Sequence, residues 1–171
     1  MGNIGDVIRE KSRCGIKMSP KETIAPTYYN GVFRHGVDAK RRIQIPAKWR
    51  PAESGIEFTV VLWPQSNEGA CLRVLPPEGM AELKRIIDAM PNDDPKKVVL
   101  KRYIGSQSEQ VTLDAVGRVC IPDEMAKEAG ISNEAVLVGS LDRFEIWNPD
   151  RHRKVQASDV VMAQEAFKLM G

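Results

Sequence analysis

The sequence predicts a mainly β protein with short helices, an α+β fold built from two copies of one unit. A nine-residue pattern occurs first at residues 38–46 and again at residues 114–122. Later apolar segments keep the same offset, so that residues 60–62 correspond to residues 136–138. A repeat that stays in register over several segments indicates duplication. The short apolar runs between turn residues are typical of strands.

Each copy of the repeat predicts a charged turn, then a short strand, then a short helix. Asp38 and Asp114 open the turns, because an Asp side chain can accept hydrogen bonds from backbone amides two residues ahead. Gly117 tolerates a positive φ within the second turn. In both copies the alternating residues that follow predict a strand, and the proline after it has the φ required to begin a helix.

The other elements are predicted in order along the chain. Strands are expected at residues 28–37, 42–45, 57–63 and 71–75. Helices are expected from Pro76 to about Ala89, from Pro95 to about Tyr103 with Asp94 as the cap, and after Asn148. Trp49 is expected to fill the core. The apolar face that runs from Met80 to Ile87 is expected to be available to a neighbouring subunit.

These elements divide the chain into five parts. We expect an N-terminal extension at residues 1–27, a first half-unit at 28–90, a linker and helix at 91–106, a second half-unit at 107–148 and a C-terminal helical segment at 149–171. The extension is expected to be flexible. Its Lys and Arg residues leave open a second interpretation, a basic arm that follows DNA phosphates. The linker helix contains four cations and also leaves two interpretations open. It either flanks DNA or is an amphipathic helix with a solvated face.

Composition excludes several classes of protein. The net charge is only +2, with 42% hydrophobic and 28% charged residues, so a nucleic-acid site must be a local patch. The three cysteines lie far apart in sequence and are expected to be reduced thiols in a cytoplasmic protein. No apolar run approaches the roughly 18 residues that span a bilayer, so no membrane association is expected. No signal peptide is predicted either.

Motifs for catalysis and cofactor binding are also missing from the sequence. The only histidines, His35 and His152, do not have the spacing of metal ligands. Neither a nucleophile elbow nor a phosphate-binding glycine loop occurs. We therefore expect a protein that is not an enzyme, with no catalytic residues, no metal, no cofactor and no small-molecule substrate.

The paired motifs Asp38-Ala-Lys-Arg-Arg-Ile-Gln-Ile-Pro46 and Asp114-Ala-Val-Gly-Arg-Val-Cys-Ile-Pro122 resemble those of the MraZ family of bacterial transcription regulators. The resemblance runs from about Tyr28 to Trp147. It implies two AbrB/SpoVT-like half-units that form one pseudo-two-fold, β-barrel-like domain. It also implies a ring-shaped homo-oligomer larger than a dimer, located in the cytoplasm at the nucleoid. The implied target is repeated boxes in the promoter of the protein's own cell-division and cell-wall operon.

The resemblance implies that the charged turns bind double-stranded DNA. The candidate DNA-binding residues are Lys40, Arg41, Arg42, Lys48 and Arg118, with Asp38 and Asp114 orienting the arginines. Residues 36–50 contain five cations and one Asp, a net +4, whereas residues 112–126 contain one Arg and three acids, a net −2. Phosphates should therefore prefer the first turn.

Within that first turn, Arg42 is the expected base or phosphate reader. One departure from the family is that Arg41 stands where Gly is usual. The alternative for both turns is an ion pair that only fixes the hairpin, and we favour this for the second turn. The competing function is a protein-interaction module, or an antitoxin-like barrel that binds a protein partner.

Overall fold

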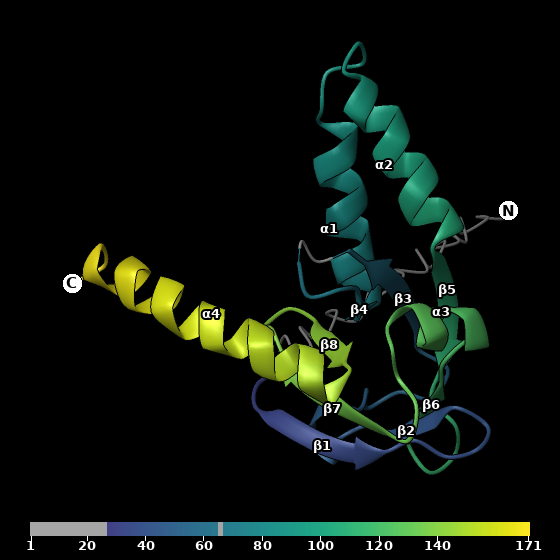
Figure 1. Ribbon diagram of the computed structural model, residues 1–171. Helices are drawn as coiled ribbons and strands as arrows, with labels where there is room; N and C mark the ends of the chain where they lie inside the picture. The colour runs from purple at the N-terminus through teal and green to yellow at the C-terminus, as the bar shows by residue number, and fades with distance from the viewer. Residues whose placement is uncertain (1–26, 65–66) are drawn as a thin grey trace, which may run out of the picture.

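The computed structural model describes residues 27–64 and 67–171, so the expected N-terminal extension lies outside it except for Thr27. The strands are β1 (Val32–Gly36), β2 (Arg42–Gln44), β3 (Glu57–Trp63), β4 (Cys71–Leu75), β5 (Ser108–Thr112), β6 (Arg118–Cys120), β7 (Glu134–Gly139) and β8 (Phe144–Trp147). The helices are the 3₁₀ turn η1 (Ala47–Trp49), α1 (Pro77–Asp88), α2 (Pro95–Ser106), α3 (Asp123–Glu128) and α4 (Pro149–Lys168). Figure 1 shows their arrangement.

Six strands form one antiparallel sheet in the order β1-β7-β8-β4-β3-β5, and β2 pairs with β6 in a separate ribbon. Strands from the two parts of the chain are paired, since β1 pairs with β7 and β3 pairs with β5. The fold is therefore mixed α+β, as the sequence predicts. The expected barrel does not close within the described residues, because β1 and β5 are opposite edges of the sheet. Instead of extending these edges into a closed ring, β2 and β6 pair with each other.

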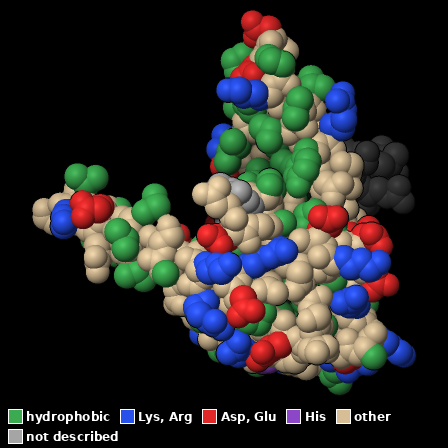
Figure 2. All heavy atoms as spheres, viewed as in Figure 1, with side chains coloured by type: hydrophobic (Ala, Val, Ile, Leu, Met, Phe, Trp, Pro, Cys, Tyr) green, Lys and Arg blue, Asp and Glu red, His purple; other side chains and the backbone are tan. Residues whose placement is uncertain are grey.

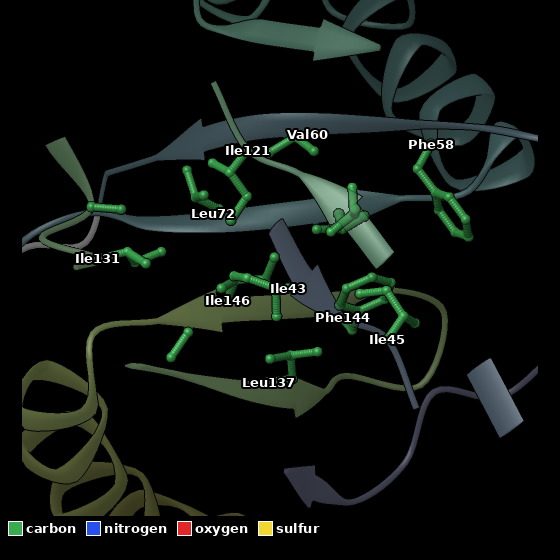
Figure 3. Packing of buried hydrophobic residues seen from close by; sticks show 14 of the residues in the cluster. Ile43, Ile45, Phe58, Val60, Leu72, Ile121, Ile131, Leu137, Phe144 and Ile146 are labelled. Carbon is green, nitrogen blue, oxygen red and sulfur yellow. The ribbon is translucent and has the colours of Figure 1, made fainter. Parts of the chain in front are cut away.

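The main core lies between the β2–β6 ribbon and one face of the six-stranded sheet (Figure 3). Alternate strand residues point into it, as the two-residue period of a strand requires; Phe58, Val60 and Leu62 of β3 are an example. Trp49 is fully buried there, which confirms its expected role. Its ring centroid lies 5.1 Å from that of Phe144, in the range of favourable aromatic pairs.

Helices cover much of the opposite face of the sheet. Val61 and Leu75 are buried against Ile87 of α1 and Ile104 of α2. A second cluster joins Cys71, Val136 and Trp147 to Val155 near the start of α4. Both faces of the central strands are covered. The sequence of β3 is therefore almost continuously apolar and does not alternate between apolar and polar residues.

Prolines and side-chain caps set the helix starts. Pro77, Pro95 and Pro149 begin α1, α2 and α4. The Asp94 carboxylate accepts a hydrogen bond from Lys96 N, as predicted for a cap. One strand start differs from expectation: β1 begins at Val32 and not at residue 28, because Gly31 has a φ of 99° that interrupts an extended strand.

The α1–α2 hairpin and α4 leave the sheet in different directions (Figure 1). Both carry exposed apolar side chains, which Figure 2 shows along the hairpin and along α4. The exposed large hydrophobic residues on these helices are Ile86, Val98, Val99, Leu100, Val160, Val161, Met162 and Phe167. No helix within the described residues is both long and apolar enough to cross a membrane.

The expectation for the Met80–Ile87 face is wrong. Ile87 is buried within the chain, and Met80 and Leu83 pack against the same intramolecular cluster. The reason is that this face packs on β3 and β4 and against α2, which leaves Ile86 exposed.

Candidate nucleic-acid interface

The first charged turn is closed by a carboxylate that accepts three hydrogen bonds. Asp38 Oδ1 accepts from the backbone N–H groups of Lys40 and Arg42, each at 2.9 Å, and Asp38 Oδ2 accepts from Arg42 Nε at 2.7 Å. The bond from the Arg42 amide is the main cause that lowers the pKa of Asp38. Asp38 therefore holds the guanidinium of Arg42 in one orientation.

The second turn has the same bonds. Asp114 Oδ1 accepts from Val116 N at 3.1 Å and Arg118 N at 2.9 Å, and Oδ2 accepts from Arg118 Nε at 2.8 Å. The Arg118 amide is again the main cause of a lowered pKa, here that of Asp114. In each turn a main-chain bond of 3.0 Å also returns to the Asp carbonyl, from Arg41 N in the first and Gly117 N in the second.

The β2–β6 ribbon brings the two turns together. Ile45 N donates to Gly117 O, and Ile121 N donates to Arg41 O, both at 2.9 Å. Each turn is thus bonded to the residue that directly follows the strand after the other turn. Gln44 Nε2 adds a side-chain bond to Val116 O at 2.8 Å. The two turns are therefore neighbours on one surface, although they are far apart in sequence.

Arg41 adopts the left-handed conformation that the first turn requires. Its φ is 59°, and Gly117 has a φ of 83° at the corresponding place in the second turn. A side chain in this region costs roughly 1–2 kcal/mol. The guanidinium, however, donates to Ile131 O at 3.0 Å and to the Asp123 carboxylate at 3.1 Å. The turn is therefore retained with Arg in place of Gly, and the Arg41 side chain is directed toward α3.

Gly117 also leaves room for the side chain of Arg50. A Cβ on Gly117 would lie 2.4 Å from Nε of Arg50, which occupies the adjacent space. Arg50 Nε in turn donates to Ile45 O at 2.9 Å. Arg50, counted in the sequence with the basic first copy, is therefore fixed beside the second turn.

The cationic side chains of the first copy differ in whether their nitrogen atoms already have hydrogen-bond partners. Within residues 27–64 and 67–171, neither Nζ of Lys40 nor the Nη atoms of Arg42 have a hydrogen-bond partner. Within the guanidinium of Arg42, Asp38 bonds to Nε, which leaves both Nη atoms available. Lys48 lies against β1 instead, with Nζ 3.0 Å from Asn30 Oδ1 and 5.1 Å from the centre of the Phe33 ring.

The charge contrast between the turns is smaller in space than in sequence. Asp123, which the sequence count assigns to the second copy, pairs with Arg41 of the first. What remains is a contrast at the turn tips: the first turn exposes Lys40, whereas the second exposes Val116, which is 56% exposed. The first turn therefore presents one more cation than the second.

Most of the predicted residues lie together in the ribbon. Lys40 and Arg42 with Asp38, and Arg118 with Asp114, occupy the paired turns, whereas Lys48 lies at β1. Sequence reasoning missed Gln44, although its position as the polar residue between Ile43 and Ile45 could have indicated it. Among the described residues, no group of three or more His, Cys, Asp or Glu side chains is placed to hold a metal ion.

Comparison with known proteins gives consistent similarities. A family described as "MraZ protein, putative antitoxin-like" matches residues 105–168. A protein of Acidithiobacillus ferrooxidans named transcriptional regulator MraZ is 33% identical over 127 residues, covering 72% of this chain and 84% of the relative. Proteins of the same name from Rhodospirillum rubrum and Caulobacter vibrioides are 34% and 29% identical, covering 75% and 79% of this chain and 87% and 86% of the relatives.

Proposed function

The chain belongs to the MraZ family, and on that premise we propose that it is a sequence-specific, DNA-binding transcriptional regulator. The observation that carries the proposal is the pair of matching turns, of which the first offers an oriented Arg42 fork and a Lys40 amine that has no partner among the described residues. The names of its relatives support the regulatory role.

Arg42 is the main reader in this proposal. A guanidinium that is held at Nε and free at both Nη atoms can donate two parallel hydrogen bonds to guanine or to a phosphate. Asp38 orients the guanidinium and does not contact the anionic duplex itself. Lys40 and Lys48 supply phosphate contacts, and Arg118 with Asp114 provides a weaker second contact. Arg41 serves chiefly to fix the first turn to α3.

We also propose that the fold is a duplication. The two turns have matching bonds, and each half of the chain has the same order of strand, turn, strand and helix. Both observations support AbrB/SpoVT-like half-units at residues 28–90 and 107–148. Residues 91–106 join them, and residues 149–171 follow. The reciprocal pairing of β1 with β7 and β5 with β3 fits a pseudo-two-fold axis through the ribbon.

A ring-shaped homo-oligomer completes the proposal. The α1–α2 hairpin and α4 leave the sheet in different directions, and each carries exposed apolar side chains that a second copy could cover. A head-to-tail contact between the hairpin of one copy and α4 of the next makes a ring when the rotation closes. Light scattering should therefore give a mass above that of a dimer. A 19.1 kDa monomer at micromolar concentration would contradict this part of the proposal.

The proposed target is a set of repeated boxes in the promoter of the protein's own cell-division and cell-wall operon, bound at the nucleoid in the cytoplasm. A single turn should bind weakly and with strong salt dependence. Linked turns in a ring gain roughly 10²–10⁴ in avidity when the boxes lie on one face of the duplex, about 10 base pairs apart.

DNA fragments with one box, with phased boxes and with boxes displaced by about half a helical turn test this proposal at fixed salt. The boxes are first identified by selection from a random pool. The phased fragment should bind most tightly, and the displaced fragment should bind like a single box. Selection that enriches no sequence, together with no salt-dependent gel shift, would remove the DNA-binding function and favour the protein-interaction module.

A further inference from the structure

A cavity of about 530 Å³ opens between the start of α1, the loop before β3 and the residues that precede β1. Its apolar lining includes Tyr28, Tyr29, Ile56, Phe58, Pro76 and Pro77. Phe58 lies at the end of the core nearest the helical hairpin (Figure 3). The volume falls within the roughly 300–1,000 Å³ of ligand sites that bind small molecules or peptide side chains. None of the lining residues belongs to either charged turn.

The rim of this cavity is acidic. Four carboxylates line it and no Lys or Arg does; they are Glu53, Glu78, Glu82 and Asp142. Two of them are already paired, Glu82 with Arg85 and Asp142 with Arg143. Within the described part of the chain, Glu53 and Glu78 form no ion pair. The cavity therefore has an apolar interior with two uncompensated negative charges at its mouth.

Two tyrosines, Tyr28 and Tyr29, also line the cavity. Burial, with a smaller effect from the charge of Glu78, raises the pKa of Tyr29 to about 12. The ring of Tyr29 packs against Trp49 and Phe144, whereas Tyr28 is 63% exposed and offers its ring face to a cation beside the carboxylates.

We propose that this cavity binds an extended, apolar peptide segment of a protein partner that carries Lys or Arg. The aromatic and proline walls are the surface that extended proline-rich segments use in other proteins, and the carboxylates select a basic side chain. The same carboxylates repel phosphates, so the cavity is a protein-binding site separate from the DNA-binding turns. The inference goes beyond the proposed function and does not depend on it.

The test uses the full chain and a blocked peptide of Pro, Leu and Arg residues, with a control peptide in which each Arg is replaced by Glu. NMR titration should shift the backbone amides of Tyr28, Ile56 and Gly79 with the basic peptide only. Glu53→Gln combined with Glu78→Gln should weaken binding about tenfold, the loss expected for charge-assisted contacts. Glu124→Gln combined with Glu128→Gln removes the same charge on α3 and should leave binding unchanged.

Several results would overturn the proposal. They are the absence of shifts at millimolar peptide, equal binding of the Glu peptide, and equal binding by the Glu53→Gln and Glu78→Gln double variant. Two others would assign the cavity to this protein itself. Shifts of Tyr28 and Ile56 that depend on protein concentration alone would indicate a second copy as the occupant. Shifts caused by Arg9→Glu with Lys11→Glu would indicate the N-terminal segment.

Discussion

The two charged turns are built alike and yet present different surfaces. Both Asp side chains accept the same three hydrogen bonds, at distances between 2.7 and 3.1 Å. The tips differ, with Lys40 in the first turn and Val116 in the second. The left-handed position differs too, with Arg41 in one and Gly117 in the other. The shared bonds make the turn, and the two variable positions determine what the turn can bind.

This comparison separates folding from recognition. An Arg whose Nε is held by an Asp is required by the turn in both copies, so its presence alone does not indicate DNA contact. What distinguishes the first turn is the exposed Lys40 beside that Arg, whose amine bonds to none of the described residues. The second turn has the same oriented guanidinium with an apolar neighbour. We therefore expect the two turns to respond alike to changes that affect stability and differently to changes that affect binding.

The largest expected effect concerns the two arginines. Arg42→Ala should weaken DNA binding by about 10–100-fold, the equivalent of the 1–3 kcal/mol of a bidentate base contact. Arg118→Ala should weaken it by less than about threefold while lowering stability by a similar amount to Arg42→Ala. Fluorescence anisotropy with a selected DNA fragment measures the first quantity, and urea unfolding the second. Equal losses of affinity from both variants would mean that the turns read DNA equivalently.

A reciprocal exchange at the tips should have the next largest effect. Lys40→Val gives the first turn the tip of the second, and Val116→Lys does the reverse. Each phosphate contact contributes about −0.9 to the slope of log affinity against log salt. Lys40→Val should therefore flatten that slope by roughly one unit, and Val116→Lys should steepen it by a similar amount. If Val116→Lys has no effect on the slope, the second turn does not face the duplex.

The third prediction concerns Arg41, the left-handed position of the first turn, and its effect is on the free energy of unfolding. Arg41→Ala loses the bonds to Ile131 and Asp123 but keeps the cost of a positive φ, so unfolding should require about 1–2 kcal/mol less. Arg41→Gly loses the same bonds and removes the backbone cost, so it should be more stable than Arg41→Ala by about 1 kcal/mol. Denaturant unfolding measures both.

Asp123→Ala removes only the exposed partner of Arg41 and should change stability by less than about 1 kcal/mol. DNA affinity should change little in any of these variants, because the Arg41 guanidinium is already bonded within the chain. A loss of affinity as large as that of Arg42→Ala would identify Arg41 as a DNA contact.

Local signals in the sequence predicted much of the fold. Proline at the first helical position predicted the starts of three helices, and β3 and β4 were predicted with their observed bounds. These features depend on neighbouring residues alone. The direction of the Arg41 side chain could not be predicted, because its partner Asp123 lies 82 residues away and is placed by the ribbon. The position of Lys48 against Phe33 is another contact between separate elements.

The arrangement of strands shows the same limit. Alternation predicted that residues 43–45 form a strand with a buried side, but it does not specify the pairing partner. Whether β2 joins an edge or pairs with β6 depends on contacts between the two halves of the chain. The packing of the Met80–Ile87 face on β3, β4 and α2 was missed for the same reason.

The smallest expected effect is a pH dependence, and here the two turns should agree. The pKa of Asp38 and that of Asp114 are both lowered in the folded protein. The main cause in each turn is a hydrogen bond from a backbone amide, that of Arg42 for Asp38 and that of Arg118 for Asp114. Folding therefore favours the ionised carboxylates. Their contribution to stability is fully present above the ordinary pKa near 3.9 and is lost as the pH falls through the lowered values.

Asp38→Asn and Asp114→Asn test this equality, because Asn keeps an oxygen acceptor for the backbone amides and cannot ionise. Each variant should be less stable than the parent at pH 7, and the difference should shrink as the pH falls below about 4. Urea unfolding between pH 7 and pH 2 gives the difference at each pH. The two curves should nearly coincide, because both carboxylates accept the same set of bonds and their side chains are exposed to the same extent, 36% and 35%. A pH dependence in one variant only would show that the turns differ in construction as well as in their exposed tips.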